Sequence, residues 1–301
     1  MVAVPNVRVG SPVTTDALTV FPLFLEAPAA PRYRLSEEAL ADGTAVVEEV
    51  SEGGSVPNLA VDNKGEAYVL FVEGQELKGA KQNRVLNTSV LIGAKSKTVL
   101  PVSCVEQGRW RYVSKGFAAS GSYGSSKLRA VLKKSVNEST MSGGGHNSDQ
   151  GAVWAEVSRQ MSSLGTASAT MAMADTVAHH KPEIDRRVAS VPYTEGAAGL
   201  AVAVGGKLVS LDIFDAPETC AKVWPKVMSG FVMDAMEEKS AAAAVPEADV
   251  TAALDALRTG DWKPVTAAGA GEEARTQSAK WNGSVLALDG ALVHGSLVSA
   301  G

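Results

Sequence analysis

Two short stretches of the chain gather side chains that could carry out chemistry. Residues 73–84 read EGQELKGAKQNR and residues 101–110 read PVSCVEQGRW, and in both stretches polar residues directly follow apolar ones. A carboxylate in such a position can act as a general base, bind a sugar hydroxyl or hold a metal ion. We therefore take Glu73, Glu76 and Glu106 as candidate catalytic residues.

The same stretches contain side chains suited to ligand binding. A guanidinium pairs with phosphate or carboxylate, an amide can read a base edge, and an indole can stack on a ring. This combination favours a nucleotide or a nucleotide sugar over an apolar ligand. The candidate ligand-binding residues are Lys81, Gln82, Asn83, Arg84, Arg109 and Trp110. If residues 80–88 are extended, Lys81 and Asn83 lie on one face, and Gln82 and Arg84 on the other. Surface ion pairs at strand ends are the alternative explanation.

Cys104 and His294 are weaker candidates for a functional role. Cys104 lies two residues before Glu106, but all four histidines are remote in sequence, so a buried inert thiol is the alternative to a nucleophile. His294 alternates within an apolar run and would face a polar pocket or pair within a sheet. The adjacent His179 and His180 lack metal-ligand spacing. We find no GxGxxG after a strand, no P-loop, no HExxH and no GxSxG motif.

The composition limits the classes of protein that the chain can belong to. With 301 residues, 45% of them hydrophobic and 20% charged, it is a folded protein rather than a disordered one. The net charge of −5 provides no global attraction to nucleic acid or anionic membranes. No apolar run reaches the roughly 20 residues of a membrane span, the N-terminus lacks a signal-peptide pattern, and two distant cysteines suit a reducing compartment. We expect a cytoplasmic protein with a nucleotide-like small-molecule partner; the oligomeric state is open.

The elements that must position these residues begin with strands. We expect a strand over 13–25, with Pro22 at an edge or bend, and a short helix over 36–41 with Ser36 as its N-cap. Glycine-containing turns then separate apolar runs as in antiparallel hairpins. These predicted strands cover 44–50, 56–61, 67–72, 85–92 and 98–105. Residues 13–110 are therefore predicted to be β-rich.

A central helical block is expected over 121–190. Residues 116–126 and the glycine-rich 141–148 are read as mobile loops. Between them, Ser126 could cap a helix whose apolar face packs inward while its basic residues stay in solvent. The apolar residues are Leu128, Val131 and Leu132, and the basic ones are Lys127, Arg129, Lys133 and Lys134. A second helix from about 150 and a third over 167–180 complete the block.

The last part, 197–301, returns to strands and further helices. Strands over 199–204 and 207–214 flank Gly205-Gly206, a hairpin signal. Pro217 opens a helix in which Pro225 should cause a kink or break. Its predicted core stripe is Cys220, Trp224, Val227, Met228, Phe231 and Ala235. A helix over 240–260 and a hairpin over 284–298, turning at Asp289-Gly290, follow.

These elements predict an α+β fold. The N-terminal half would be mostly antiparallel sheet, followed by the helical block and by C-terminal strands and helices packed on the same core. We expect one domain over residues 1–301.

The two polar stretches together resemble the core motif of a known family, the ARG and rhodanese-phosphatase-superfamily-associated protein domain. LTVFPLF at 18–24, LVSLDIFDAPETCAKVWPKV at 208–227 and the closing strand with His294 agree, so the resemblance spans about 16 to 297. It implies that the candidate residues of both stretches, with Cys104, belong to the defining motif. The family's name reflects genomic neighbours that include ADP-ribosylglycohydrolases. The resemblance thus implies a role on ADP-ribose or related nucleotides in conflict or stress systems.

The leading hypothesis is an enzyme or processing factor acting on a nucleotide-derived ligand such as ADP-ribose or NAD. Arg84 and Arg109 would bind phosphates and Trp110 would stack, while Glu106 or Glu73 would activate water or hold a divalent metal. The cofactor is otherwise unknown. One alternative is a non-catalytic ligand sensor that reports through a mobile 116–150 segment. Another is a structural or interaction protein whose polar stretch is an interface or a buried network.

Overall fold

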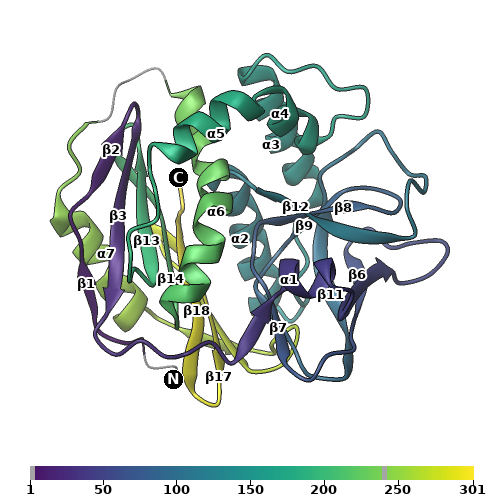
Figure 1. Cartoon of the computed structure of the whole chain (residues 1–301), viewed down its shortest axis with the longest axis horizontal. Helices are drawn as coiled ribbons and strands as arrows, with labels where there is room; N and C mark the ends of the chain where they lie inside the picture. Colours follow the sequence, from purple (N-terminus) through teal and green to yellow (C-terminus); the bar gives the residue numbers. More distant parts are fainter. Residues whose placement is uncertain (1–3, 239–242) are drawn as a thin grey trace. The chain divides into compact units, whose positions relative to one another are not determined.

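The computed structural model describes residues 4–238 and 243–301, and their contacts divide the chain into two compact units (Figure 1). The sheet unit comprises the chain up to Pro31, Lys181–Val265 and Glu272–Gly301. The barrel unit comprises Arg32–His180 and Thr266–Gly271. The single domain expected over residues 1–301 stays a prediction.

The sheet unit contains an open antiparallel sheet of nine strands. Their order is β1-β3-β13-β14-β18-β17-β16-β15, and β2 also pairs with β3. The bounds are β1 Val7–Val9, β2 Val13–Thr15, β3 Leu18–Leu25, β13 Gly199–Val204, β14 Lys207–Phe214, β15 Lys263–Val265, β16 Glu272–Gln277, β17 Trp281–Leu288 and β18 Ala291–Ser299. On one side β3 pairs with β2 up to Val20 and with β1 from Leu23, so Pro22 lies between these two pairings. The hairpins at Gly205-Gly206 and Asp289-Gly290 are confirmed.

The described residues of the sheet unit form three helices: α5 (Lys181–Ala189), α6 (Pro217–Glu237) and α7 (Glu247–Thr259). Buried residues of α7, among them Val250 and Leu257, form one core with Leu211 and Leu297 of the sheet. The predicted core stripe of α6 is buried in full, and the helix continues through Pro225 without a break. Of the helix predicted over 240–260, residues 240–242 lie outside the described part of the chain.

The barrel unit is built on a closed barrel of six strands. Its order is β11-β6-β5-β12-β8-β9, and a separate sheet has the order β10-β7-β4, in which β4 and β7 are parallel. The bounds are β4 Tyr33–Leu35, β5 Ala45–Glu49, β6 Asn58–Asn63, β7 Tyr68–Phe71, β8 Gln75–Gly79, β9 Arg84–Leu86, β10 Val90–Ile92, β11 Ser96–Cys104 and β12 Gly116–Tyr123. The apolar core of this unit includes Val47, Leu77, Leu86, Val102 and Phe117.

Four helices lie in the barrel unit: α1 (Ser36–Ala41), α2 (Ser126–Met141), α3 (Gln150–Ser163) and α4 (Met173–His179). Neither predicted N-cap serine holds that position. Leu35 precedes α1, and Ser36 instead donates a hydrogen bond to Gln75 Oε1 at 2.8 Å. Ser125, not Ser126, caps α2 by accepting a hydrogen bond from the Leu128 N–H.

Strand β8 lies inside the polar stretch and was not predicted, and β12 replaces most of the loop expected over 116–126. Two strands, β9 and β10, stand where one strand was expected over 85–92. Of the helix expected over 167–180, only the part that forms α4 is helical. Residues 80–83 form a turn rather than extended chain. Gly79 enters this turn at φ 134°, and a Cβ there would lie 2.5 Å from the Gly116 carbonyl oxygen, so only glycine fits.

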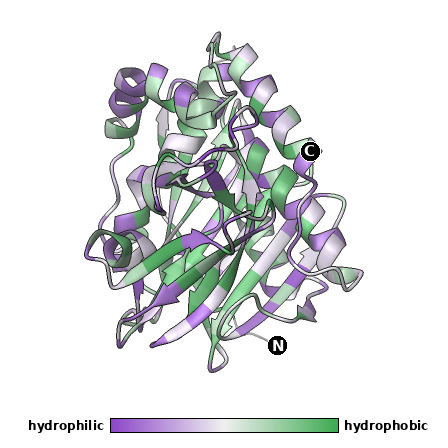
Figure 2. Ribbon diagram, turned by 90° about the vertical axis from the view of Figure 1, so that its right-hand side faces the viewer, coloured by the Kyte–Doolittle hydropathy of each residue, from purple (hydrophilic) through white to green (hydrophobic). Residues whose placement is uncertain are grey.

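The predicted α+β class with antiparallel sheets is confirmed. Figure 2 shows largely hydrophobic strands, whereas the helices alternate hydrophobic and hydrophilic segments along their length. In residues 4–238 and 243–301, no helix combines the length and apolarity that crossing a membrane requires.

Candidate functional site

An ion pair between Glu106 and Arg109 joins the two polar stretches. Arg109 Nε and Nη2 donate to the two Glu106 carboxylate oxygens at 2.8 and 2.6 Å. The remaining Arg109 donors reach the Ala80 and Arg111 carbonyl oxygens at 2.7 and 3.1 Å, and Asn83 Oδ1 at 3.1 Å. An arginine has five N–H donors, and all five are engaged within the protein.

The Glu106 carboxylate accepts two further hydrogen bonds. The Asn83 N–H donates to it at 3.1 Å and the Thr170 hydroxyl at 3.0 Å. Burial raises the pKa of Glu106, but the hydrogen bonds from Arg109, Asn83 and Thr170 oppose this and bring the pKa below its ordinary value. Glu106 is therefore an ionised carboxylate surrounded by donors of its own protein.

The turn that connects β8 and β9 completes this polar network. The Gln82 side chain donates a short hydrogen bond to the Glu106 carbonyl oxygen. Arg84 Nη1 donates to the Gln82 carbonyl oxygen at 2.8 Å. The structure thus brings Gln82, Asn83, Arg84, Glu106 and Arg109 into one connected set.

Three polar side chains mark one end of the barrel interior. On β5, Glu49 points into the barrel like Ala45 and Val47, because alternate residues of a strand share a face. On β9, Arg84 points inward like Leu86, and it lies opposite Cys104 of β11. Arg84 is fully buried, and its Nη2 lies 3.6 Å from Glu49 Oε1, whose side chain is 2% exposed. Burial lowers the pKa of Arg84, which the nearby Cys104 and Glu49 oppose. We call this end the barrel mouth.

Cys104 is buried at the mouth and has the properties of an inert thiol. Burial raises its pKa to about 11, although the positive charge of Arg84 acts in the opposite direction. Its Sγ lies 3.9 Å from the Val56 carbonyl oxygen, and its backbone N–H donates to Gln150 Oε1 at 2.8 Å. At neutral pH the thiol is protonated, which disfavours nucleophilic attack.

Lys81 lies at the mouth between two half-exposed aromatic rings. Its ammonium nitrogen is 5.5 Å from the centre of the Trp110 ring and 5.1 Å from that of Tyr112, and each ring residue is 47% exposed. Arg84 also lies under the Trp110 ring, at 5.4 Å. Such cation–π contacts hold the rings in place. The Lys81 ammonium donates one hydrogen bond to a described residue, the Gly53 carbonyl oxygen, at 2.8 Å.

Glu73 is held by a different set of partners. Its two carboxylate oxygens accept from Arg129 Nη2 at 3.0 Å and from Lys133 Nζ at 2.6 Å. Both cations come from α2 and are 2% exposed, so the expectation that they face solvent is wrong. A helix buries such residues when a buried partner neutralises them.

Glu76 has no such partners. It lies on β8 opposite Val85, which packs in the apolar cluster of α2, α3 and α4, and it is completely buried. Neither carboxylate oxygen has a hydrogen-bond partner in the described chain. The nearby Ser120 hydroxyl instead donates to the Ser122 carbonyl oxygen at 3.4 Å. Burial raises the pKa of Glu76 to about 7; the charge of Lys78 and the nearby Ser120 hydroxyl oppose this, and the charges of Glu106 and Asp175 add to it.

His294 belongs to the sheet unit. Its Nε2 lies 3.3 Å from Asp212 Oδ1, and its ring stacks on Phe214 with ring centres 4.6 Å apart. Asp212 also accepts from the Ser210 hydroxyl at 3.0 Å. Of the two alternatives, a polar pocket or pairing within the sheet, these contacts agree with pairing within the sheet, where His294 lies opposite Phe214 and Leu286.

Several residues of these sets are not among the candidates predicted from the sequence. Tyr112 could have been found, because it follows Trp110 at the strand-like spacing of two. Glu49 and Thr170 could not, because neither belongs to the two polar stretches and only the folded chain brings them there. The missed residues are Glu49, Tyr112, Arg129, Lys133 and Thr170.

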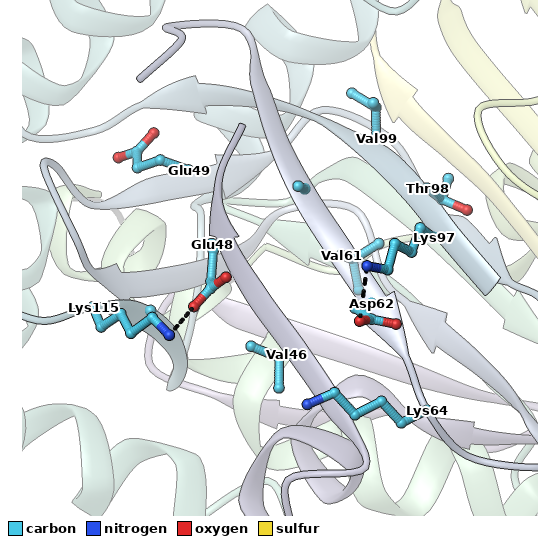
Figure 3. A pocket seen from close by; sticks show the side chains of 12 residues that line it. Val46, Glu48, Glu49, Val61, Asp62, Lys64, Lys97, Thr98, Val99 and Lys115 are labelled. Atoms are coloured by element: carbon cyan, nitrogen blue, oxygen red, sulfur yellow. Dashed lines mark ion pairs between the residues drawn. The ribbon is translucent and has the colours of Figure 1, made fainter. Parts of the chain in front are cut away.

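A shallow depression of about 700 Å³ on the outer wall of the barrel is lined by residues of β5, β6, β11 and β12. Figure 3 shows that Glu48 pairs with Lys115 and Asp62 with Lys97, each at 3.5 Å, while Glu49 is directed away from Glu48. None of the predicted site residues lines it. In residues 4–238 and 243–301, His, Cys, Asp and Glu side chains form no group of three or more that could hold a metal ion.

Fold and site together define an α+β protein with a closed barrel whose mouth is supported by a buried polar network. The chain belongs to the family described as the ARG and Rhodanese-Phosphatase-superfamily-associated Protein domain, whose family model matches residues 6–298. The family is associated, by this description, with ARG and rhodanese-phosphatase-superfamily proteins. No curated protein and no solved structure gave a match to the chain.

Proposed function

We propose that this protein binds a nucleotide-derived ligand, of the ADP-ribose or NAD class, at the barrel mouth. The observation that carries the proposal is the Lys81 ammonium held between the half-exposed rings of Trp110 and Tyr112. Aromatic rings at a barrel mouth offer stacking surfaces for a base, and an ammonium with unused donors attracts a phosphate.

Binding rather than hydrolysis is the activity that the geometry favours. A general base must come within hydrogen-bond reach of the water that it activates. Glu106 is surrounded by donors of its own network, Glu73 pairs with Arg129 and Lys133, and Glu76 is completely buried. We therefore propose a non-catalytic ligand-binding protein, in which the network behind the mouth serves as a scaffold.

The proposal predicts separate effects for the residues of the mouth. Stacking on one aromatic side chain contributes about 1–3 kcal/mol per base, so Trp110→Ala or Tyr112→Ala should weaken ADP-ribose binding about tenfold or more. Lys81→Met keeps the length of the side chain but removes its charge, and we expect a similar loss. Isothermal titration calorimetry with ADP-ribose and with NAD measures these changes.

Matched controls lie on β11. Val99 is an exposed apolar residue and Lys97 an exposed lysine, so Val99→Ala and Lys97→Met should leave the affinity unchanged. Turnover of either ligand would contradict a purely binding function. Absence of binding to the wild-type protein, or equal losses in the control variants, would contradict the site itself.

A further inference from the structure

The loop over residues 51–57, here called the mouth loop, fills the barrel mouth with its own backbone. Its carbonyl oxygens accept hydrogen bonds from three side chains of the mouth. The Tyr112 hydroxyl donates to Glu52 at 3.4 Å, Lys81 Nζ to Gly53 at 2.8 Å and Arg84 Nη2 to Ser55 at 3.4 Å. Neutral carbonyl oxygens thus occupy donors that would bind an anionic oxygen more strongly.

Beneath the mouth loop, one acceptor and one donor are left over. Glu49 Oε2 and Arg84 Nε are both buried and have no hydrogen-bond partner in the described chain. The Oε2 atom faces the loop, because a Cβ on Gly54 would lie 3.2 Å from it. A buried polar group without a hydrogen-bond partner costs free energy, so the closed position of the loop is less stable than one in which both atoms have partners.

The charge of the mouth favours an anion. Lys81 and Arg84 are cationic and Glu49 lies 3.6 Å from Arg84, so these three groups carry a formal net charge of +1, while Glu48, Glu52 and Lys115 line an open depression outside them. This depression, of about 630 Å³, is also lined by Glu49 and Tyr112. There is room for a ligand next to the loop without any change in the barrel wall.

We propose that the mouth loop is a flap, and that a sugar phosphate displaces it. This inference rests on the proposed function and deepens it by naming the part of the ligand that enters. Phosphate oxygens replace the loop carbonyl oxygens on Lys81 and Arg84. A hydroxyl of the adjoining sugar donates to the open oxygen of Glu49, and the base stacks on the aromatic rings. Gly53 and Gly54 lie in the loop, and glycine can adopt more backbone conformations than other residues; in the closed loop Gly54 has a positive φ of 74°.

A substitution at Gly54 tests the flap. An alanine there is strained by the positive φ, and its Cβ would lie 3.1 Å from Lys81 Cδ and 3.3 Å from Trp110 Cζ2, so it destabilises the closed loop. Gly54→Ala should therefore raise the affinity for ADP-ribose roughly fivefold, the ratio that corresponds to about 1 kcal/mol. Gly53→Ala is the matched control, because its Cβ meets only Ser51 Oγ, at 3.7 Å.

Limited proteolysis of the wild-type protein provides a second measurement. Cleavage after Glu52, identified by mass spectrometry, should become faster when ADP-ribose is bound. The flap is overturned if Gly54→Ala weakens binding or leaves it unchanged and the ligand does not speed cleavage after Glu52. The loop is then a fixed wall of the site, and the proposed function stands. If ADP-ribose binds neither the wild type nor Gly54→Ala, the proposed function falls as well.

The sugar contact has its own test. The backbone N–H of Lys81 donates to Glu49 Oε1 at 3.2 Å. Glu49→Gln keeps an oxygen acceptor for this hydrogen bond but replaces the other carboxylate oxygen by an amide nitrogen. We expect weaker binding of ADP-ribose but no loss of affinity for inorganic pyrophosphate, which has no sugar and gains from the removal of a neighbouring negative charge. Equal losses for both probes would overturn the hydroxyl contact.

Discussion

Replacement of Arg109 by methionine should lower the free energy of unfolding by about 3–5 kcal/mol, the usual cost of removing one partner of a buried ion pair. Without the guanidinium, the Glu106 carboxylate keeps only the Asn83 N–H and the Thr170 hydroxyl. The carbonyl oxygen of Ala80 loses a hydrogen bond as well. Urea unfolding at neutral pH measures the change.

Arg111→Met is the matched control for Arg109→Met. Arg111 lies two residues further on, and it is exposed, so its side chain should contribute less than about 1 kcal/mol. In the double variant Arg109→Met/Glu106→Gln, part of the lost stability should return because no buried charge remains. A variant of Arg109 as stable as wild type but defective in ADP-ribose binding would instead make Arg109 a ligand contact.

Replacement of Glu76 by glutamine should stabilise the protein at pH 8 by roughly 3 kcal/mol, the amount that corresponds to a pKa displaced from 4.5 to about 7. Between pH 4.5 and about pH 7 the folded state retains the proton on Glu76, whereas the unfolded state releases it. Wild-type stability therefore falls as the pH rises from about 4.5 to about 7. A glutamine is neutral at every pH, so the variant does not lose stability as the pH rises through this range.

Urea unfolding at intervals from pH 5 to pH 8 checks the prediction for Glu76. Near pH 5 the two proteins should differ little, because a protonated carboxyl and an amide are both neutral, and the difference should grow with pH. Glu66→Gln is the control, since the Glu66 side chain is 85% exposed. Parallel pH profiles for wild type and Glu76→Gln would show that the buried carboxyl has found a partner.

The strands that are apolar runs on either side of a clear turn signal were predictable. The strands β13 and β14 begin and end where the sequence pattern places them. The strand β8 was missed because its outward residues, Glu76 and Lys78, resemble a polar turn and Leu77 alone marks its inner side. β12 was missed because GFAASGSY is rich in small residues, which the pattern assigns to a loop.

The sequence indicated which polar residues lie near one another better than it indicated how they are arranged. The two polar stretches do meet, through Gln82, Asn83 and Arg109. Sequence patterns could not show that Arg109 uses all its donors internally, because two of its partners are backbone carbonyl oxygens and Asn83 lies 26 residues away. The buried α2 cations were assigned to solvent for a related reason, since their partner Glu73 lies 56 and 60 residues away.

The closure of the barrel has a consequence for self-association. Six strands joined in a ring leave no unpaired backbone edge, so the barrel offers no template for strand addition by another chain. The nine-stranded sheet is open, but the strand at one of its edges, β15, is three residues long and reads Lys263-Pro264-Val265. Lysine and proline on a short edge oppose pairing with a neighbour. The closed barrel and the β15 edge of the nine-stranded sheet thus carry protection against edge-to-edge aggregation.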